Sequence, residues 1–292
     1  MDERMVQVRP PSEANSFLLP VTLGCSNNEC TFCSSYLGVK FRIRHREDIK
    51  RDIDEVARSY SRSVSQVFLE NGDALITPQN TLIEVLKHLN QRFPHLDRVG
   101  TYATPRAALI KSIDELKELN NLNLKIAYLG VETGDEELLQ KIKKGVTCDQ
   151  MVEAGIKLKL AGITTSVTVI LGLGSIEGSE NHALKTARIL SDIDPDFAGA
   201  LTIMLVPGTP LHKDWKEGRF SLISPFQALE ELKLIIQNSN FTNCFFTANH
   251  ASNYLPIKLR LPEQKAEGIK LIDDVLTRKD MSQLRPEFTR AL

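Results

Sequence analysis

The feature that most constrains the fold of this sequence is a repeated alternation of short apolar runs with amphipathic helical stretches. Six apolar runs, each followed within a few residues by Gly, Pro, Asn or Asp, have the composition of buried parallel strands. These runs are Phe17–Leu23, Gln66–Leu69, Arg98–Tyr102, Leu124–Leu129, Thr165–Leu171 and Ala198–Leu205. The helical stretches are Arg46–Ser61, Pro78–Arg92, Asp135–Lys143, Cys148–Leu160, Glu180–Leu190 and Pro225–Gln237. Successive β–α units imply right-handed crossovers and a parallel sheet, and six are too few for the closed eight-stranded barrel. We therefore predict an α/β fold, an open partial (βα)6 barrel of parallel strands.

The rhythm changes after about residue 240, where FTNCFFTANHASNYLP indicates a strand followed by an irregular polar loop. Pro262–Thr277 is expected to form a closing helix. We predict a barrel over residues 15–240 and a short C-terminal closing extension over 241–292 that packs on it. The first fifteen residues and the last ten or so are expected to be peripheral or poorly ordered.

Composition and charge restrict the partners. The 292 residues carry 36 basic and 37 acidic side chains, a net charge of −1, so no global cationic field gathers polyanions. A nucleic-acid partner is therefore not expected. No apolar run approaches the ~20 residues needed to cross a bilayer, and the N-terminus lacks the apolar core of a signal peptide. A cytoplasmic location without a membrane partner is the expectation, and the sequence leaves the oligomeric state open.

The cysteines indicate a metal site. Of the five, three lie in one loop after the first strand, Gly24-Cys25-Ser-Asn-Asn-Glu-Cys30-Thr-Phe32-Cys33. An odd number of cysteines in a reducing compartment argues against a disulfide framework. Three thiolates in one loop suit either zinc, which would need a fourth ligand, or a 4Fe–4S cluster with one iron left open. No second Cys-x-x-Cys follows, which favours the cluster.

This loop resembles that of the radical S-adenosylmethionine (SAM) superfamily. The family pattern is Cys-x3-Cys-x2-Cys after the first strand of a partial barrel, with an aromatic residue before the last cysteine. Phe32 has that aromatic place, whereas the first spacing is Cys-x4-Cys, one residue longer. The resemblance implies that Cys25, Cys30 and Cys33 ligate a 4Fe–4S cluster and that SAM chelates the fourth iron.

Three later strand ends extend the resemblance over about residues 15–240, most closely to the coproporphyrinogen-oxidase-like and Elongator-catalytic-subunit-like branch. Gly72-Asp73 has the place of the family's Gly-Gly-Glu turn, which holds the methionine amino group. Glu132, Thr133 and Gly134 match a Gly-x-Glu-Ser/Thr-Gly motif whose acid binds the ribose hydroxyls. The fifth and sixth strand ends, which contact adenine in relatives, contribute Ile170, Gly172, Leu205 and Val206.

Each of these segments also has a purely structural interpretation. Asn71-Gly72 is a common turn between a strand and a helix. Glu132 could be an acid that favours a helix N-terminus, and the last two runs could be core strands followed by turns. The order of all the elements along the chain favours the SAM interpretation.

The resemblance implies an iron–sulfur enzyme that reductively cleaves SAM to a 5′-deoxyadenosyl radical, with a flavodoxin- or ferredoxin-like electron donor. The expected substrate is an unidentified small molecule. One alternative is a non-catalytic cofactor-handling protein similar to the haem chaperones of this branch. A zinc-binding structural protein is another.

The polar loop after the barrel offers candidates for the substrate side, namely Asn249, His250, Asn253 and Tyr254. They could equally satisfy strand and helix ends. Cys148 and Cys244 are single and are expected to be small buried residues. His182, in a helical stretch, is expected to be an ordinary surface or satisfied histidine.

Overall fold

The structure, a computed structural model, describes residues 8–291. The chain divides into two compact units, which we describe separately. The first comprises Met1–Asn28, Ser35–Leu129 and Glu153–Thr165, and the second Glu29–Ser34, Gly130–Val152 and Ser166–Leu292. Among the described residues, no helix has the length and apolar character needed to span a bilayer.

The first unit is built on parallel strands in the order β1-β4-β5-β6. These strands are β1 (Phe17–Pro20), β4 (Gln66–Glu70), β5 (Arg98–Ala103) and β6 (Leu124–Glu132), the last ending in the second unit. A small antiparallel pair joins β2 (Thr22–Leu23) to β3 (Arg42–Ile43). The helical elements are η1 (Pro11–Glu13), α1 (Arg46–Tyr60), η2 (Ala74–Ile76), α2 (Gln79–Arg92), α3 (Pro105–Leu109), α4 (Ile113–Asn121) and the greater part of α6 (Cys148–Leu160).

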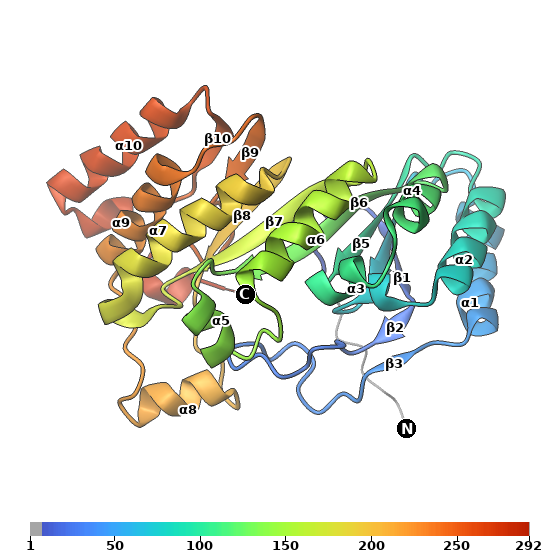
Figure 1. Cartoon of the computed structure of the whole chain (residues 1–292), viewed down its shortest axis with the longest axis horizontal. Helices are drawn as coiled ribbons and strands as arrows, with labels where there is room; N and C mark the ends of the chain where they lie inside the picture. Colours follow the sequence, from blue (N-terminus) through green and yellow to red (C-terminus); the bar gives the residue numbers. More distant parts are fainter. Residues whose placement is uncertain (1–7, 292) are drawn as a thin grey trace. The chain divides into compact units, whose positions relative to one another are not determined.

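One face of these strands packs on helices. Val67 and Leu69 of β4 belong to one buried apolar cluster with Ile53 of α1, Leu86 of α2 and Leu116 of α4. Figure 1 shows α1, α2 and α4 beside these strands. Because side chains alternate along a strand, Phe68 and Glu70 must point to the opposite face. The first unit therefore has a second, inner face with its own chemistry.

The inner face is aromatic and ionic. The Phe68 ring lies edge-on to Tyr102 and Tyr128, with centroids 4.9 and 5.7 Å away. Glu13, which is fully buried, accepts 2.5 Å hydrogen bonds from Arg98 Nη1 and the Tyr128 hydroxyl. The expectation that the first fifteen residues are peripheral is wrong for this described part. A buried ion pair ties Glu13 to β5, and such partners are distant in sequence.

The second unit orders its strands β7-β8-β9-β10, with β7, β8 and β9 parallel and β10 antiparallel to β9. The strands are β7 (Thr164–Leu171), which begins in the first unit, β8 (Phe197–Thr202), β9 (Cys244–Thr247) and β10 (Lys258–Leu261). The helical elements are α5 (Glu136–Lys141), α7 (Ser175–Ile193), α8 (Pro210–Lys216), α9 (Pro225–Asn238), α10 (Lys265–Arg278), η3 (Met281–Gln283) and η4 (Glu287–Thr289). Helix α9 packs between α7 and α10, and these helices lie beside the strands of this unit (Figure 1).

The predicted α/β class with parallel strands is confirmed. All six expected strands exist, although Phe17–Leu23 is divided between β1 and β2 and the last ends at Thr202 instead of Leu205. Helices α3, α4 and α8 and strand β10 were not expected. The proposed division at residue 240 stays a prediction, since the two compact units describe packing and not independent domains.

Glu70 gives a pH test of the inner face of the first unit. Its side chain is fully buried, and neither carboxylate oxygen has a hydrogen-bond partner among residues 8–291. Burial raises the pKa of this carboxyl from 4.5 to about 7, opposed by the nearby Arg9 charge. The folded state thus holds the proton more tightly than the unfolded state, so Glu70 lowers stability as pH rises from 4.5 through about 7.

We expect Glu70→Gln to be more stable than the wild-type chain at pH 8, by about 2 kcal/mol, and near-equal at pH 5. Denaturant unfolding at both pH values measures this difference. Glu84→Gln serves as the control because Glu84 is ion-paired with Arg46 and Lys50 at the surface. If the difference in stability between Glu70→Gln and the wild-type chain were the same at pH 8 as at pH 5, the raised pKa of Glu70 would be contradicted.

Candidate cluster and cofactor site

Cys25 lies in the loop after β2 and packs against the turn after β4, both within the first unit. Gly24 has a left-handed φ of 77°, which aims the loop toward this turn. Gly72 N–H donates to Gly24 O at 3.1 Å, and Asn71 Oδ1 accepts from Gly24 N–H at 3.2 Å. A Cβ on Gly72 would lie 2.6 Å from Cys25 Cβ and 3.0 Å from its sulfur. Glycine at position 72 is therefore required for Cys25 to occupy its place.

Asp73 joins this turn to two other loops. Its side chain is fully buried, and it accepts hydrogen bonds from the Ser26 hydroxyl and from the backbone and hydroxyl of Thr104 at 3.1 and 2.9 Å. The cysteine loop, the turn after β4 and the start of α3 are thus fixed by one carboxylate. Sequence reasoning found Asp73 but not Ser26 or Thr104. The Thr104-Pro105 pair directly after a strand could have indicated the latter as a helix cap.

Cys30 and Cys33 belong to the second unit, where their segment is pinned on two sides. Thr31 N–H donates to Ile142 O at 3.0 Å, and Thr31 O accepts from Leu211 N–H at 2.9 Å. Phe32 packs on an apolar cluster around α5 and the ends of β7 and β8, which includes Leu139, Ile142, Ile170, Leu173, Ile203 and Leu211. The aromatic residue before the last cysteine thus anchors this part of the loop.

The thiols have the chemistry that an iron–sulfur cluster requires. Cys25, Cys30 and Cys33 are all reduced and only partly buried. Cys25 belongs to the first unit, Cys30 and Cys33 to the second. Within residues 8–291 no three His, Cys, Asp or Glu side chains are gathered as a metal-binding group. The donor set nevertheless fits a soft metal or cluster, because three thiols within nine positions form no disulfide and are only partly buried.

Glu132 ends β6 and is held by an ion pair. Its carboxylate Oε1 lies 2.7 Å from Lys144 Nζ, and both side chains are 11 % exposed. Glu132 has a left-handed φ of 65°, an unusual conformation for a side chain of this kind. Backbone strain of this sort costs of order 1–3 kcal/mol and persists where the surroundings fix it. The Glu132-Thr133-Gly134 motif gives no reason to expect this ion pair, because Lys144 lies twelve positions further along the chain.

Thr133 and Gly134 fit closely against α7. The Thr133 hydroxyl lies 2.8 Å from His182 Nδ1, and Gly134 N–H donates to Thr186 Oγ1 at 3.1 Å. A Cβ on Gly134 would overlap the carbonyl oxygen of Lys185. The motif thus lies against the helix backbone with no space for a side chain.

The end of β7 carries the next candidates. Ile170 is buried, and Gly172 has a left-handed φ of 81° and packs against Ile223. Gly172 N–H donates to Glu231 Oε2 at 2.6 Å. After β8, Leu205 packs on the same apolar cluster as Ile170, and Val206 O accepts from Thr209 N–H at 3.2 Å. Ile170 and Leu205 thus share one apolar cluster. Gly172, which has no side chain, lets the Ile203 and Ile223 side chains pack closely against its backbone.

Several polar side chains of the loop after β9 form hydrogen bonds with other groups of the protein. Asn253 donates to Ala200 O at 2.8 Å and accepts from the Thr202 hydroxyl at 2.9 Å, and it is 2 % exposed. His250 Nδ1 accepts from Ser252 N–H at 3.2 Å, and burial, followed by the Arg285 charge, lowers its pKa. Asn249 is exposed.

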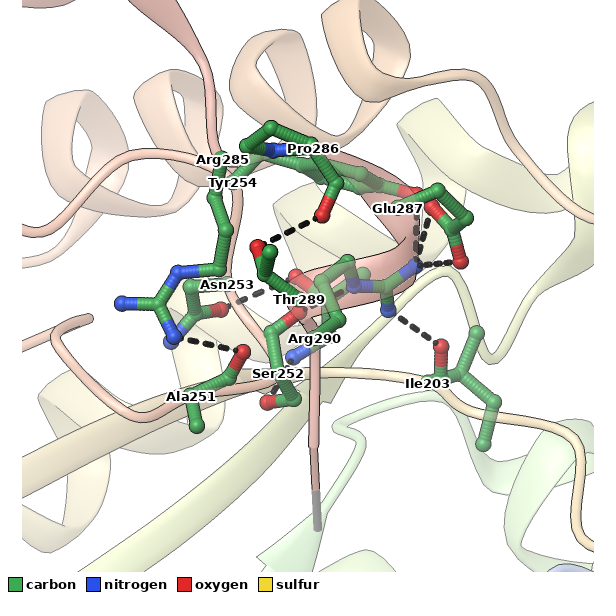
Figure 2. Close-up of polar contacts among 11 residues, drawn as sticks. Ile203, Ala251, Ser252, Asn253, Tyr254, Arg285, Pro286, Glu287, Thr289 and Arg290 are labelled. Carbon is green, nitrogen blue, oxygen red and sulfur yellow. Dashed lines mark hydrogen bonds and ion pairs between the residues drawn. The ribbon is translucent and has the colours of Figure 1, made fainter.

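Tyr254 is clamped by Arg290, as Figure 2 shows. The guanidinium donates to the Tyr254 hydroxyl, to Ser252 O and to Ile203 O at 2.6, 2.7 and 2.9 Å, and it lies 4.3 Å from the Tyr254 ring centroid. Arg290 is 4 % exposed, so the expectation that the last ten residues are peripheral is wrong for it. A substrate role for Asn249, His250, Asn253 and Tyr254 stays a prediction.

The two single cysteines have structural surroundings. Cys244 is fully buried in β9. Cys148 begins α6, lies 3.2 Å from Gly134 O, and has a pKa that burial raises to about 12. A thiol with so high a pKa is a poor metal ligand at neutral pH.

The arrangement defines a class of protein: a parallel α/β fold with three cysteines in the loop after β2 and close glycine contacts directly after β4, β6 and β7. A family model described as the radical SAM superfamily matches residues 19–187. This match covers more than half of the chain, and the protein belongs to the radical SAM superfamily. Members of this superfamily are enzymes that use a 4Fe–4S cluster and SAM.

A curated relative and two solved structures extend the comparison. The chain is 26 % identical over 195 residues to the probable threonylcarbamoyladenosine tRNA methylthiotransferase of Methanocaldococcus jannaschii, covering 61 % of this chain and 42 % of the relative. Coproporphyrinogen III oxidase (HemN) of Escherichia coli superposes with a TM-score of 0.58 at 16 % identity, over 76 % of this chain and 51 % of that one. Elp3 of Methanocaldococcus infernus superposes with a TM-score of 0.52 at 16 % identity, over 90 % of this chain and 63 % of that one.

These likenesses confirm the open partial barrel as the fold. The chain spans less than half of the length of the first curated relatives, between 22 % and 46 %. Those relatives are named for tRNA modification. The expectation that nucleic acid plays no part thus has no support from them.

Replacement of Lys144 tests whether its ion pair holds the Glu132 carboxylate in the position needed to bind SAM. We expect Lys144→Met to weaken SAM binding about tenfold, because the Glu132 carboxylate then loses the ion pair that holds it in position. Equilibrium dialysis of the reconstituted protein measures the change. Lys143→Met, one residue away, is the matched control and should bind as the wild type does. Equal affinities in all three proteins would show that Lys144 does not hold Glu132 for the cofactor.

Proposed function

We propose that this protein is an iron–sulfur enzyme that reductively cleaves SAM, with Cys25, Cys30 and Cys33 as cluster ligands. When bound, the reduced cluster and SAM supply a 5′-deoxyadenosyl radical that starts chemistry on a substrate. The observation that carries the proposal is the close packing of Cys25 against the Gly72-Asp73 turn, where only glycine fits at position 72. This turn has the place of the family's Gly-Gly-Glu turn, which holds the methionine amino group.

The chain's own groups would divide the work of binding. The backbone of Gly72 and Asp73 would receive the methionine end, while the Asp73 carboxylate, already bonded to Ser26 and Thr104, fixes the turn. Glu132 would accept hydrogen bonds from the two ribose hydroxyls, with Lys144 holding its carboxylate in place. The adenine would be contacted by Ile170, Gly172, Leu205 and Val206. Thr133 and Gly134, which are bonded to α7, would hold the end of β6 in place for SAM.

The substrate is proposed to be a small molecule, because 36 basic and 37 acidic residues give no cationic excess. A tRNA nucleoside is the second candidate, since the curated relatives are named for tRNA modification. A flavodoxin- or ferredoxin-like protein would supply the electron. A non-catalytic cofactor-handling protein would keep the cluster and SAM but not turn over.

Anaerobic reconstitution followed by reduction with dithionite tests the proposal. We expect about four irons per chain and formation of 5′-deoxyadenosine and methionine from SAM. About one zinc and no iron would support the structural alternative instead. Iron and SAM binding without 5′-deoxyadenosine would support the cofactor-handling alternative. Retention of bulk tRNA at 150 mM salt, measured by filter binding, would favour the tRNA candidate over a small molecule.

A further inference from the structure

His182 of α7 connects the ends of two neighbouring strands within the second unit. Its side chain is 1 % exposed. Nδ1 lies 2.8 Å from the hydroxyl of Thr133, after β6, and Nε2 lies 3.0 Å from the carbonyl oxygen of Ile170, in β7. A single imidazole therefore spans two segments that the proposed function assigns to SAM.

The hydrogen-bond directions follow from the neighbours. The Ile170 carbonyl oxygen at Nε2 can only accept. Nδ1 faces the Thr133 hydroxyl, which itself accepts from Asp135 N–H at 3.0 Å, and at 3.3 Å the Thr186 hydroxyl, and both of these groups can donate to it. Nε2 then carries the imidazole proton and donates it to Ile170 O. This is the neutral form, and burial lowers the pKa of His182 to about 4, which keeps it neutral near pH 7. The ring thus accepts from one strand end and donates to the other.

Glu231 of α9 completes the connection. Its side chain is 1 % exposed, Oε2 accepts from Gly172 N–H at 2.6 Å, and Oε1 lies 3.3 Å from His182 Nε2. Oε1 has no hydrogen-bond partner in the described part of the chain. Two polar side chains are thus buried together where apolar side chains would be less costly to bury. Their shared feature is that both bind backbone at the end of β7.

We propose that His182 and Glu231 are positioning residues that hold Thr133, Ile170 and Gly172 in the geometry that binds SAM. The inference rests on the proposed function, because those strand ends are its SAM contacts. Without His182, the Ile170 carbonyl loses its donor and the Thr133 hydroxyl its acceptor. Without Glu231, Gly172 N–H, in a left-handed residue of φ 81°, loses its acceptor. Neither residue is proposed to touch the cofactor.

The experiment compares His182→Phe with His182→Gln, whose amide can still donate to Ile170 O, and with Glu231→Gln. Leu190→Ala is the control, because Leu190 is a fully buried α7 residue outside this hydrogen-bond network. Two readouts are measured: amide hydrogen exchange of Gly134, Asp135 and Gly172 without cofactor, and the SAM dissociation constant after cluster reconstitution. Iron content is determined for every variant.

We expect His182→Phe to bind SAM at least tenfold more weakly, with unchanged iron content and faster exchange at the three amides. In both SAM affinity and amide exchange, His182→Gln and Glu231→Gln should be intermediate between His182→Phe and the wild type. Leu190→Ala should lose thermal stability without either local effect. Should His182→Phe and Leu190→Ala show the same exchange at the three amides, the positioning role is wrong. A wild-type chain that binds iron but no SAM would refute the proposed function, and the exchange would still decide the positioning role. If His182→Phe does not fold, Glu231→Leu, which removes the acceptor of Gly172 N–H, decides on the same readouts.

Discussion

Replacement of Cys30 by alanine should abolish the iron–sulfur absorbance and SAM cleavage together. Cys30 is one of three thiols in the loop, and a cluster held by two protein ligands is exposed to loss of iron. The segment itself should keep its fold, because Thr31 remains bonded to Ile142 and Leu211 and Phe32 remains in its apolar cluster. We expect less than a tenth of the wild-type iron and no measurable 5′-deoxyadenosine.

Cys148→Ala is the matched control for this prediction. Cys148 is also a partly buried thiol of the second unit, but its pKa is raised to about 12 and its sulfur contacts Gly134 O. It should keep wild-type iron content and cleavage, with a modest loss of stability of about 1 kcal/mol. A Cys30→Ala protein with the wild-type spectrum and turnover would contradict the cluster assignment. Loss of iron in Cys148→Ala as well would show that the spectrum reports general stability.

Local sequence patterns predicted most of the secondary structure because the signals are local. Helix α6 begins and ends where its periodicity and flanking residues indicated, at Cys148 and Leu160. Helix α7 begins five residues before the predicted Glu180. Ser175, with a φ of 62°, starts the helix directly after the glycine-rich strand end, which was interpreted as a turn. Helix α4 was missed although Ser112 and Glu115 form a capping box, a signal that the sequence contains.

The contacts that sequence reasoning did not find join residues that are far apart in the chain. Glu13 meets Arg98 and Tyr128 across more than eighty positions, and no periodicity marks such a contact. His182 was expected to be an ordinary surface or satisfied histidine. It is buried and satisfied, by two strand ends that come together only in the fold. The three thiols and the Glu132-Thr133-Gly134 motif could be recognised because their chemistry depends on spacing along the chain. Arg290 could not, since three of its acceptors are distant in the chain, namely Ile203 O directly after β8 and Ser252 O and the Tyr254 hydroxyl after β9.

Gly134→Ala should be among the most damaging single changes in the second unit. A methyl group at this position would overlap the Lys185 carbonyl oxygen and lie 2.8 Å from Ile189 Cγ2, so the strand end must move away from α7. Overpacking of this kind costs about 1–3 kcal/mol, and here the obstacle is helix backbone, which cannot rotate aside. The movement would also stretch the hydrogen bond from Gly134 N–H to Thr186. We expect a loss of about 3 kcal/mol in the free energy of unfolding and SAM binding weakened more than tenfold.

Gly178→Ala supplies the opposite expectation from the same helix. Gly178 lies inside α7, and a Cβ there meets no atom within 4 Å. Because alanine is the better helix former, this variant should gain about 0.5–1 kcal/mol and bind SAM as the wild type does. Denaturant unfolding and equilibrium dialysis on the two variants separate close packing from general glycine effects. If Gly134→Ala were as stable as Gly178→Ala, the contact between the motif and α7 would not exist in solution. If it lost stability but bound SAM normally, Gly134 would be a packing residue alone, and the strand end would not contribute to the cofactor site.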